Sequence, residues 1–185
     1  MKKLFLLLFL ASSFVFTSCN SDDGDEPIMI DESLIPGLWN VTAMEVSDGK
    51  SVTTFDGTSI TANYSSYGKD FDFQVNFIDS TDPKTFTSEG GYTAVVTISA
   101  FGQSQTQEET VSDFFGAGTW SVENNKLLMT NTVDGQTVVQ EGEITMLTEE
   151  TLKMRIVFDE TIEDADLGIS VRTSGVVEST LTRAQ

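Results

Sequence analysis

The stretch Phe71-Asp72-Phe73-Gln74-Val75-Asn76-Phe77 is the clearest structural signal in the chain, because its apolar and polar side chains alternate without interruption. Successive side chains of an extended strand point to opposite faces of a sheet. A period of two therefore places Phe71, Phe73, Val75 and Phe77 on one face and the polar residues on the other. A strand of this kind buries one face and shows the other to water, which is typical of antiparallel sheets.

The same alternation recurs elsewhere, and turn-forming residues separate the runs. Further strand candidates are Tyr92–Ile98, Ile144–Met146 and Leu152–Phe158. The predicted turns are Ser47–Lys50, Asp56–Gly57, Glu89–Gly91, Glu123–Lys126 and Asp134–Gly135. Since no window of a dozen residues keeps a helical stripe and open sheet edges invite aggregation, the pattern predicts an all-β fold: a single antiparallel closed barrel of eight to ten strands.

The interior of such a barrel has two interpretations that the sequence leaves open. With about eight strands, the interior is either filled by side chains or wide enough to hold one small ligand. The phenylalanine-rich strand bears on this choice. Phe71, Phe73, Val75 and Phe77 are candidates to line an apolar cavity, and they are equally candidates to pack the core.

Composition excludes several kinds of chemistry. The 185 residues include no His and one Cys, so a Ser-His-Asp triad, a Cys-His pair, an imidazole ligand and an internal disulfide are all excluded. Nothing in the linear sequence identifies a pair of catalytic carboxylates. We therefore predict no catalytic residues, no enzyme activity and no cofactor. The net charge of -19 also argues against binding of nucleic acid.

The chain begins with an export signal. Lys2 and Lys3 precede an apolar run that is too short to span a bilayer, and Thr17 and Ser18 lead into the single Cys19. We predict a lipoprotein signal peptide at residues 1–18 and a lipid, such as palmitate, on Cys19. The alternative is an ordinary secretory peptide followed by an incidental cysteine.

The residues after Cys19 are predicted to form a tether. Residues 19–33 are acidic, and no basic residue occurs between Cys19 and Lys50, so this segment cannot build a core. The domain is then expected at residues 34–185. The segment from Ser21 to Glu26 resembles the acidic signal of surface-exposed lipoproteins of the Bacteroidetes, which implies anchoring in the outer membrane facing the cell surface. Anchoring that faces the periplasm is the alternative.

Short motifs at both ends of the predicted domain resemble the lipocalin pattern. Gly37 and Trp39 match a Gly-x-Trp motif that opens the first strand, and Arg183 matches an arginine near the chain end. The resemblance implies that this guanidinium lies on the indole of Trp39 and seals the closed end of a barrel. Middle segments, including Gly118-Thr119-Trp120, are similar to the lipocalin-like lipoproteins common in Bacteroidetes.

An acidic segment at residues 159–166 is the remaining candidate for a metal site. Its carboxylate density suits calcium, but the spacing does not match an EF-hand, and a solvated hairpin loop is the simpler interpretation. We predict no metal site there.

Two functional hypotheses remain. In the first, a membrane-anchored lipocalin-like protein binds a small hydrophobic molecule in its barrel, as a carrier or sensor. In the second, the barrel is filled, and its loops bind a protein or a glycan. Neither hypothesis identifies the ligand.

Overall fold

A computed structural model of the chain describes residues 30–112, 115–133, 136–164 and 168–185. Within these ranges it contains one short 3-10 helix, η1 (Glu32–Leu34), nine strands and no α-helix. The strands are β1 (Gly37–Phe55), β2 (Thr58–Ile78), β3 (Thr85–Ala100), β4 (Gln103–Ser112), β5 (Ala117–Glu123), β6 (Lys126–Val133), β7 (Gln136–Leu147), β8 (Thr151–Asp164) and β9 (Ile169–Arg183). The predicted all-β fold and strand number are confirmed.

The predicted signal peptide, Cys19 and most of the predicted tether lie outside the described residues. The described part begins at Ile30, which packs against the core, and Asp31 and Glu32 belong to η1 and its N-terminal cap. No helix in the described ranges has the length and apolar content required to cross a bilayer.

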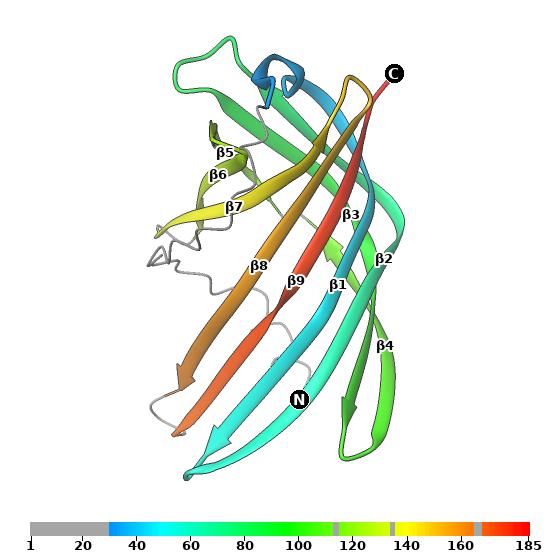
Figure 1. Cartoon of the computed structure of the whole chain (residues 1–185), viewed down its shortest axis with the longest axis vertical. Coiled ribbons are helices and arrows are strands. Elements are labelled where there is room, and N and C mark those ends of the chain that lie inside the picture. The colour runs from blue at the N-terminus through cyan, green and yellow to red at the C-terminus, as the bar shows by residue number, and fades with distance from the viewer. Residues whose placement is uncertain (1–29, 113–114, 134–135, 165–167) are drawn as a thin grey trace, which may run out of the picture.

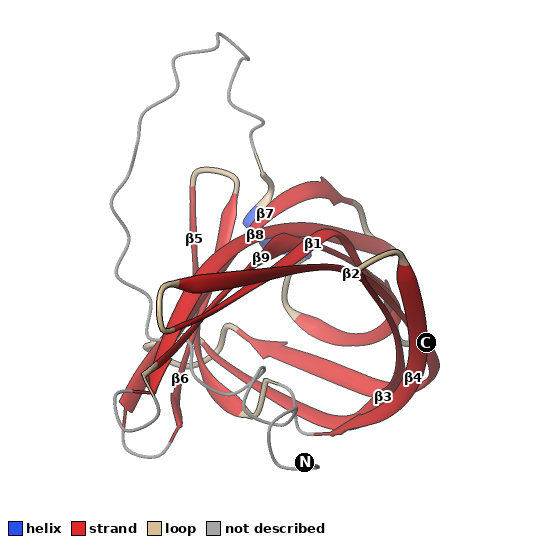
Figure 2. Cartoon of the chain, turned by 90° about the horizontal axis from the view of Figure 1, so that it is seen from below, coloured by secondary structure: helices blue, strands red, loops and turns tan. Residues whose placement is uncertain are grey.

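Eight strands close into a ring, and all neighbouring strands are antiparallel. The order runs β2-β1-β9-β8-β7-β6-β5-β3, and β3 pairs with β2 to complete the circle. Viewed along the long axis, the strands surround one interior (Figure 2). The first residues of β3 pair with β5, and its later part, Gly91–Ala100, pairs with β4. The predicted closed barrel is therefore confirmed, with β4 as an additional strand outside the ring.

The wall of the barrel is tall on one side and short on the other. β1 and β2 contain 19 and 21 residues, whereas β5 and β6 contain 7 and 8. We call the part in which all eight ring strands meet the closed half, and the part beyond it the open half (Figure 1). The open half is the curved sheet formed by residues 49–55, 58–68, 94–100, 103–112, 156–164 and 169–176.

The hydrophobic core fills the closed half. Inward side chains of every ring strand meet there, and the aromatic ones contact each other: ring centroids of Phe73 and Phe115 are 5.6 Å apart, and those of Phe77 and Trp120 are 5.7 Å apart. The buried core residues are Ile35, Trp39, Val41, Met44, Phe73, Val75, Phe77, Phe86, Tyr92, Ala94, Phe115, Trp120, Leu127, Met129, Ile144, Leu152, Met154 and Leu181. Burial of this apolar surface provides the main driving force for folding.

Two predicted turns proved wrong because the strands pass through them. Ser47–Lys50 lies within β1, where the pairing with both neighbours shifts between Val46 and Lys50. Glu89–Gly91 lies within β3, opposite a shift of β2 between Lys69 and Asp72. The first is a β-bulge in β1, where Asp48 has a positive φ. In the second, the extra residue lies in β2, where Asp70 has a positive φ, and the glycines of β3 lie on the facing strand. Neither irregularity ends its strand. Glycine and aspartate signal a bulge as readily as a turn.

Two other predicted turns are confirmed. Asp56–Gly57 joins β1 to β2, and Glu123–Lys126 joins β5 to β6, with positive φ at Asp56, Gly57 and Asn124. Asp134–Gly135 lies outside the described residues. The predicted acidic loop at 159–166 is wrong for its first part, because residues 159–164 continue β8 in unbroken register with β9.

Candidate functional site

Trp39 and Arg183 meet in the closed half of the barrel, where β1 pairs with β9. Trp39 is fully buried, and its indole Nε1 donates a hydrogen bond to the Ile35 carbonyl at 2.8 Å. The Arg183 guanidinium lies over the indole at 4.2 Å and donates to the Pro36 carbonyl at 2.9 Å. It also donates to the carbonyls of Leu34 and Glu149. One guanidinium therefore joins the beginning and the end of the domain.

Gly37 is the third residue of this arrangement. Its φ is +125°, and a Cβ at that position would lie 2.5 Å from Arg183 Nη1. A larger residue would displace the guanidinium, so the Gly-x-Trp spacing has a steric reason. The structure thus brings together the three residues that the lipocalin resemblance singled out.

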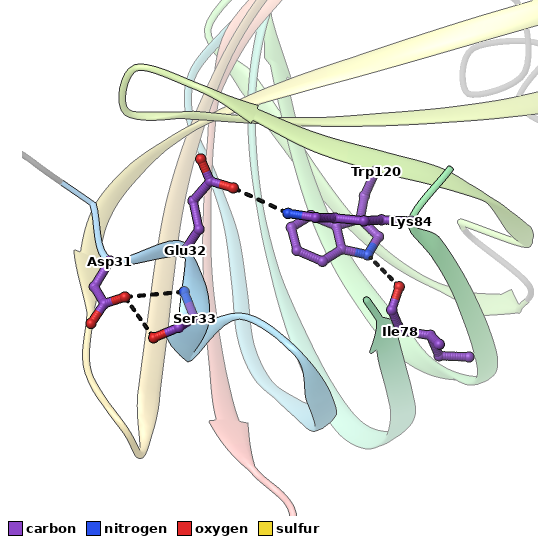
Figure 3. A network of polar contacts seen from close by, with 6 residues as sticks. All are labelled: Asp31, Glu32, Ser33, Ile78, Lys84 and Trp120. Carbon is purple, nitrogen blue, oxygen red and sulfur yellow. Dashed lines mark hydrogen bonds and ion pairs between the residues drawn. The ribbon is translucent and has the colours of Figure 1, made fainter. Parts of the chain in front are cut away.

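A second tryptophan is capped in a related way. Lys84 Nζ lies 4.6 Å from the ring centroid of Trp120, whose Nε1 donates to the Ile78 carbonyl at 3.2 Å (Figure 3). Lys84 also pairs with Glu32 at 3.2 Å, and Asp31 caps the same 3-10 turn through the Ser33 amide. This contact holds η1 against the barrel wall.

Sequence reasoning missed the role of Lys84 and Glu32. A signal was present, since Gly118-Thr119-Trp120 repeats the spacing of Gly37-Leu38-Trp39. No linear pattern links Lys84 or Glu32 to that second motif. Their contact depends on the ring closure that brings the start of β3 beside β5.

The four cavity candidates lie in the closed half. Phe73, Val75 and Phe77 are buried within the core cluster, and Phe71 packs against that cluster. Phe71 also stacks on Tyr92, with ring centroids 5.3 Å apart. All four side chains therefore contact the packed interior of the closed half.

The inner face of the open half is a second apolar surface. Alternation continues from the core along each tall strand, and the bulges in β1 and β2 each shift it by one residue. The inward residues of the open half are therefore those that share a face with inward neighbours across the ladder, as Tyr64 does with Ile98. Apolar inward residues that remain partly or largely exposed are Phe55, Ile60, Ala62, Tyr64, Val96, Ile98, Ala100, Ile156, Phe158, Ile162, Ile169 and Val171. This surface is the candidate binding site.

The outer face of the same strands is largely polar. It carries cross-strand hydrogen bonds between Thr97 and Thr106 at 2.9 Å and between Ser99 and Ser104 at 2.7 Å. Asp159 and Arg172 form a two-point ion pair there, and this pairing lowers the pKa of Asp159. The two faces of the open half therefore differ in polarity.

Two glycines allow aromatic rings to lie flat on the inner wall where the open half begins. A Cβ at Gly49 would lie 2.7 Å from the Tyr64 ring, and a Cβ at Gly175 would lie 2.9 Å from the Phe158 ring. A Cβ at Gly175 would also lie 3.3 Å from the Cα of Gly49. The two glycines are therefore neighbours, and together they form the surface on which both rings lie, here called the glycine floor. Tyr64 reaches over β1, and its hydroxyl donates to the Ser174 carbonyl at 3.5 Å.

Glu160 is an acidic group on this inner face. It follows Phe158 by two residues in β8 and is half-buried, and this burial raises its pKa. Burial, with a smaller contribution from the Glu160 charge, raises the pKa of Tyr64 to about 12. Among the described residues, Glu160 forms no ion pair with Lys or Arg. The inner face thus combines apolar side chains with polar ones, since Gln105 and Gln107 of β4 lie opposite Ile98 and Val96. Glu160 lies beside its aromatic residues.

Metal binding has no support within the described ranges, where no group of three or more Asp, Glu, Cys or His residues is suitably placed to hold an ion. One shallow hollow of about 390 Å³ lies beside the β1 bulge, with Asp48, Lys50, Asn63 and Tyr64 among the residues of its wall.

Fold and site together define an antiparallel β-barrel with a packed closed end and an open, apolar inner face. No family model matches the chain, and no curated protein sequence matches it. Among solved structures, the chain is similar to Ail, the attachment invasion locus protein of Yersinia pestis, at 10% identity and a TM-score of 0.25. That match covers 81% of this chain and 100% of the other.

Proposed function

We propose that this protein is a lipocalin-like binding protein without catalytic activity that holds a small apolar or amphipathic molecule on the inner face of its open half. The observation that carries the proposal is the continued alternation beyond the core. Apolar side chains such as Phe158, Ile162 and Val171 face inward but remain partly exposed. Covering this surface with apolar ligand area would release ordered water and supply most of the affinity.

The proposal also includes a lipid anchor. Cys19, which lies outside the described residues, would carry the lipid, and residues after it would connect the lipid to η1. The barrel wall supports this arrangement, because a barrel that spans a membrane turns its apolar side chains outward. Here the core faces inward, and Asn40, Gln74 and Asn76 alternate with buried residues. We propose attachment to the outer membrane with the domain facing the cell surface.

Titration with a fluorescent fatty-acid probe tests the binding site. We expect saturable binding to the purified protein. Phe158→Asp should weaken probe binding by about tenfold or more, because it removes the ring from the glycine floor and places a second charge beside Glu160. Val157→Asp is the matched control, since Val157 lies next to Phe158 but is 61% exposed on the outer face. Equal effects of the two substitutions would refute the site.

The anchor needs a separate experiment. Cells expressing the native chain should incorporate labelled palmitate, and Cys19→Ala should abolish the incorporation. Protease treatment of intact cells should release the domain if it faces outward. Protection from the protease in intact cells, together with cleavage after lysis, would contradict surface display.

A further inference from the structure

One edge of the sheet in the open half has no partner strand. β7 pairs with β8 only through Leu152–Arg155, and from Ile156 to Asp164 β8 pairs with β9 alone. The described residues at the start of β7, Gln136–Gly142, pair with β6 instead, and β7 diverges from β8 (Figure 1). The side of β8 that faces away from β9 therefore has no neighbouring strand from Ile156 to Glu163 in the described ranges, and every second residue of this segment directs its backbone N–H and C=O to that side.

This edge is protected by acidic side chains alone. Proteins blunt free edges with charged side chains, including inward-pointing ones, with proline or with a bulge. The carboxylates of this segment disfavour an acidic partner strand but not a basic one. The segment Ile156–Asp164 contains no proline and no lysine, and its register with β9 has no shift. Val157, 61% exposed, adds an apolar contact on the outer face. The segment is a regular template for an added strand.

The side chains of this edge specify the chemistry of the added strand. Phe158 and Ile162 lie on the inner face and Val157 on the outer face, while Glu160 and Glu163 supply negative charge. Neither glutamate forms an ion pair with Lys or Arg among the described residues. Cross-strand neighbours of opposite charge and apolar neighbours both stabilise a ladder, so a strand with apolar and basic residues fits this edge.

A second copy of the chain fits poorly. Self-pairing through this edge would place acidic residues beside acidic residues, and each copy carries a net charge of -19. Like charges directly opposite each other destabilise a strand pair. The other unpaired edge, β4, is rich in glutamine and glutamate, so it does not supply the basic partner either.

We infer that the Ile156–Asp164 edge of β8 binds an extended segment of a partner protein in which Lys or Arg alternates with apolar residues, as an additional strand of the sheet. Backbone hydrogen bonds supply affinity in this mode, and the acidic side chains select the sequence. The inference concerns the edge of the sheet and does not depend on an apolar ligand bound to its inner face.

Synthetic nonapeptides test this inference against the full-length protein in detergent. A peptide of alternating Val and Lys should bind saturably and slow hydrogen exchange of the β8 amides between Ile156 and Asp164. The same peptide with alternate backbone amides methylated keeps its charge but cannot complete the backbone hydrogen bonds of a strand pair. Its affinity should therefore be at least about tenfold lower. A Val-Glu peptide should not bind. Equal binding of the methylated peptide, or no binding of the Val-Lys peptide, would overturn the inference.

A pair of double variants separates local from overall charge. Glu160→Gln with Glu163→Gln should weaken binding of the Val-Lys peptide severalfold. Glu149→Gln with Glu150→Gln makes the same change in net charge at the other end of β8, where the strand joins β7, and should leave binding unchanged. Equal losses in both would show attraction to net charge only and would overturn the edge site. Fatty-acid probe binding to Val157→Asp and Phe158→Asp reports independently on the inner face.

Discussion

Arg183 makes more contacts that join distant parts of the chain than any other side chain discussed above. It covers the Trp39 ring and donates to backbone carbonyls of Pro36, Leu34 and Glu149. The planar guanidinium suits these contacts, because its N–H groups point in several fixed directions and can donate to several carbonyls at once. Lysine would keep the charge and lose this planar group.

Replacing Arg183 should therefore destabilise the whole barrel. We expect Arg183→Met to lower the free energy of unfolding by about 3 kcal/mol, because it removes the cation–π contact and leaves part-buried carbonyls without donors. Arg183→Lys should recover only part of the loss. Urea denaturation followed by circular dichroism measures both. Arg172→Met is the control, since its ion pair is exposed and should contribute less than about 1 kcal/mol.

Tyr92 should make stability depend on alkaline pH. Burial raises its pKa to about 12, above its ordinary value of 10.0, so the folded state favours the neutral phenol. The resulting stabilisation is fully present below pH 10 and is lost as the pH rises toward 12. The loss should approach about 2 to 3 kcal/mol. Tyr92→Phe should reduce the decline in unfolding free energy over this range and leave the part contributed by Tyr64, whose pKa is raised in the same way. An unchanged decline would contradict the assignment.

At the scale of strands, bulges shape the tall wall. Gly90 has a φ of +82°, and a Cβ there would lie 1.5 Å from the Asp72 carbonyl oxygen, across the irregular pairing of β2 and β3. The close approach explains why glycine is needed on β3 beside the bulge of β2. The local pattern predicts a turn here because it cannot show whether the backbone before and after a glycine pairs with the same neighbour.

The close backbone approach at Gly90 predicts a steep cost of substitution. Gly90→Ala should destabilise the protein by roughly 3 kcal/mol or more, because backbone strain and a backbone clash coincide. Gly57→Ala is the matched control: Gly57 also has a positive φ, of +73°, but nothing lies within 4 Å of its Cβ position. That change should cost only about 1 to 2 kcal/mol of strain. Thermal unfolding of the two variants compares them directly, and similar losses would argue against the clash.

For the whole molecule, the two halves of the barrel should differ in local stability. The closed half contains the buried core, whereas the open half has partly exposed apolar residues and, among the strands that the structure describes, two edges without a partner strand. Segments with few buried contacts open without unfolding the rest. The open half is therefore suited to adapt to a ligand or a partner strand, while the closed half maintains the scaffold.

Hydrogen exchange should resolve this difference within a single strand. Amides of β8 at Leu152–Met154 should exchange only through global unfolding, while those at Phe158–Asp164 should exchange at least about tenfold faster. Both segments pair with β9, so the comparison isolates the effect of the core and of the missing β7 neighbour. Uniform protection along β8 would show that the open half is as stable as the closed half.

The amino-acid sequence alone determined the all-β class, the inward face of the strand at Phe71–Phe77, and two of the hairpins. These follow from alternation and turn chemistry, which act between near neighbours in the chain. The Gly-x-Trp motif and the terminal arginine marked Gly37, Trp39 and Arg183 before their contact was known. The signal peptide and Cys19 remain predictions, since they lie outside the described residues.

Only the tertiary structure decided where the barrel is filled and where it is open. Whether Asp159–Asp164 forms a loop or an edge strand depends on its pairing with β9 and on the divergence of β7, and both involve residues distant in sequence. The same holds for the meeting of Lys84 with Trp120 and of Tyr64 with Ser174. Alternation specifies which side chains share a face, but ring closure and strand length specify what that face meets.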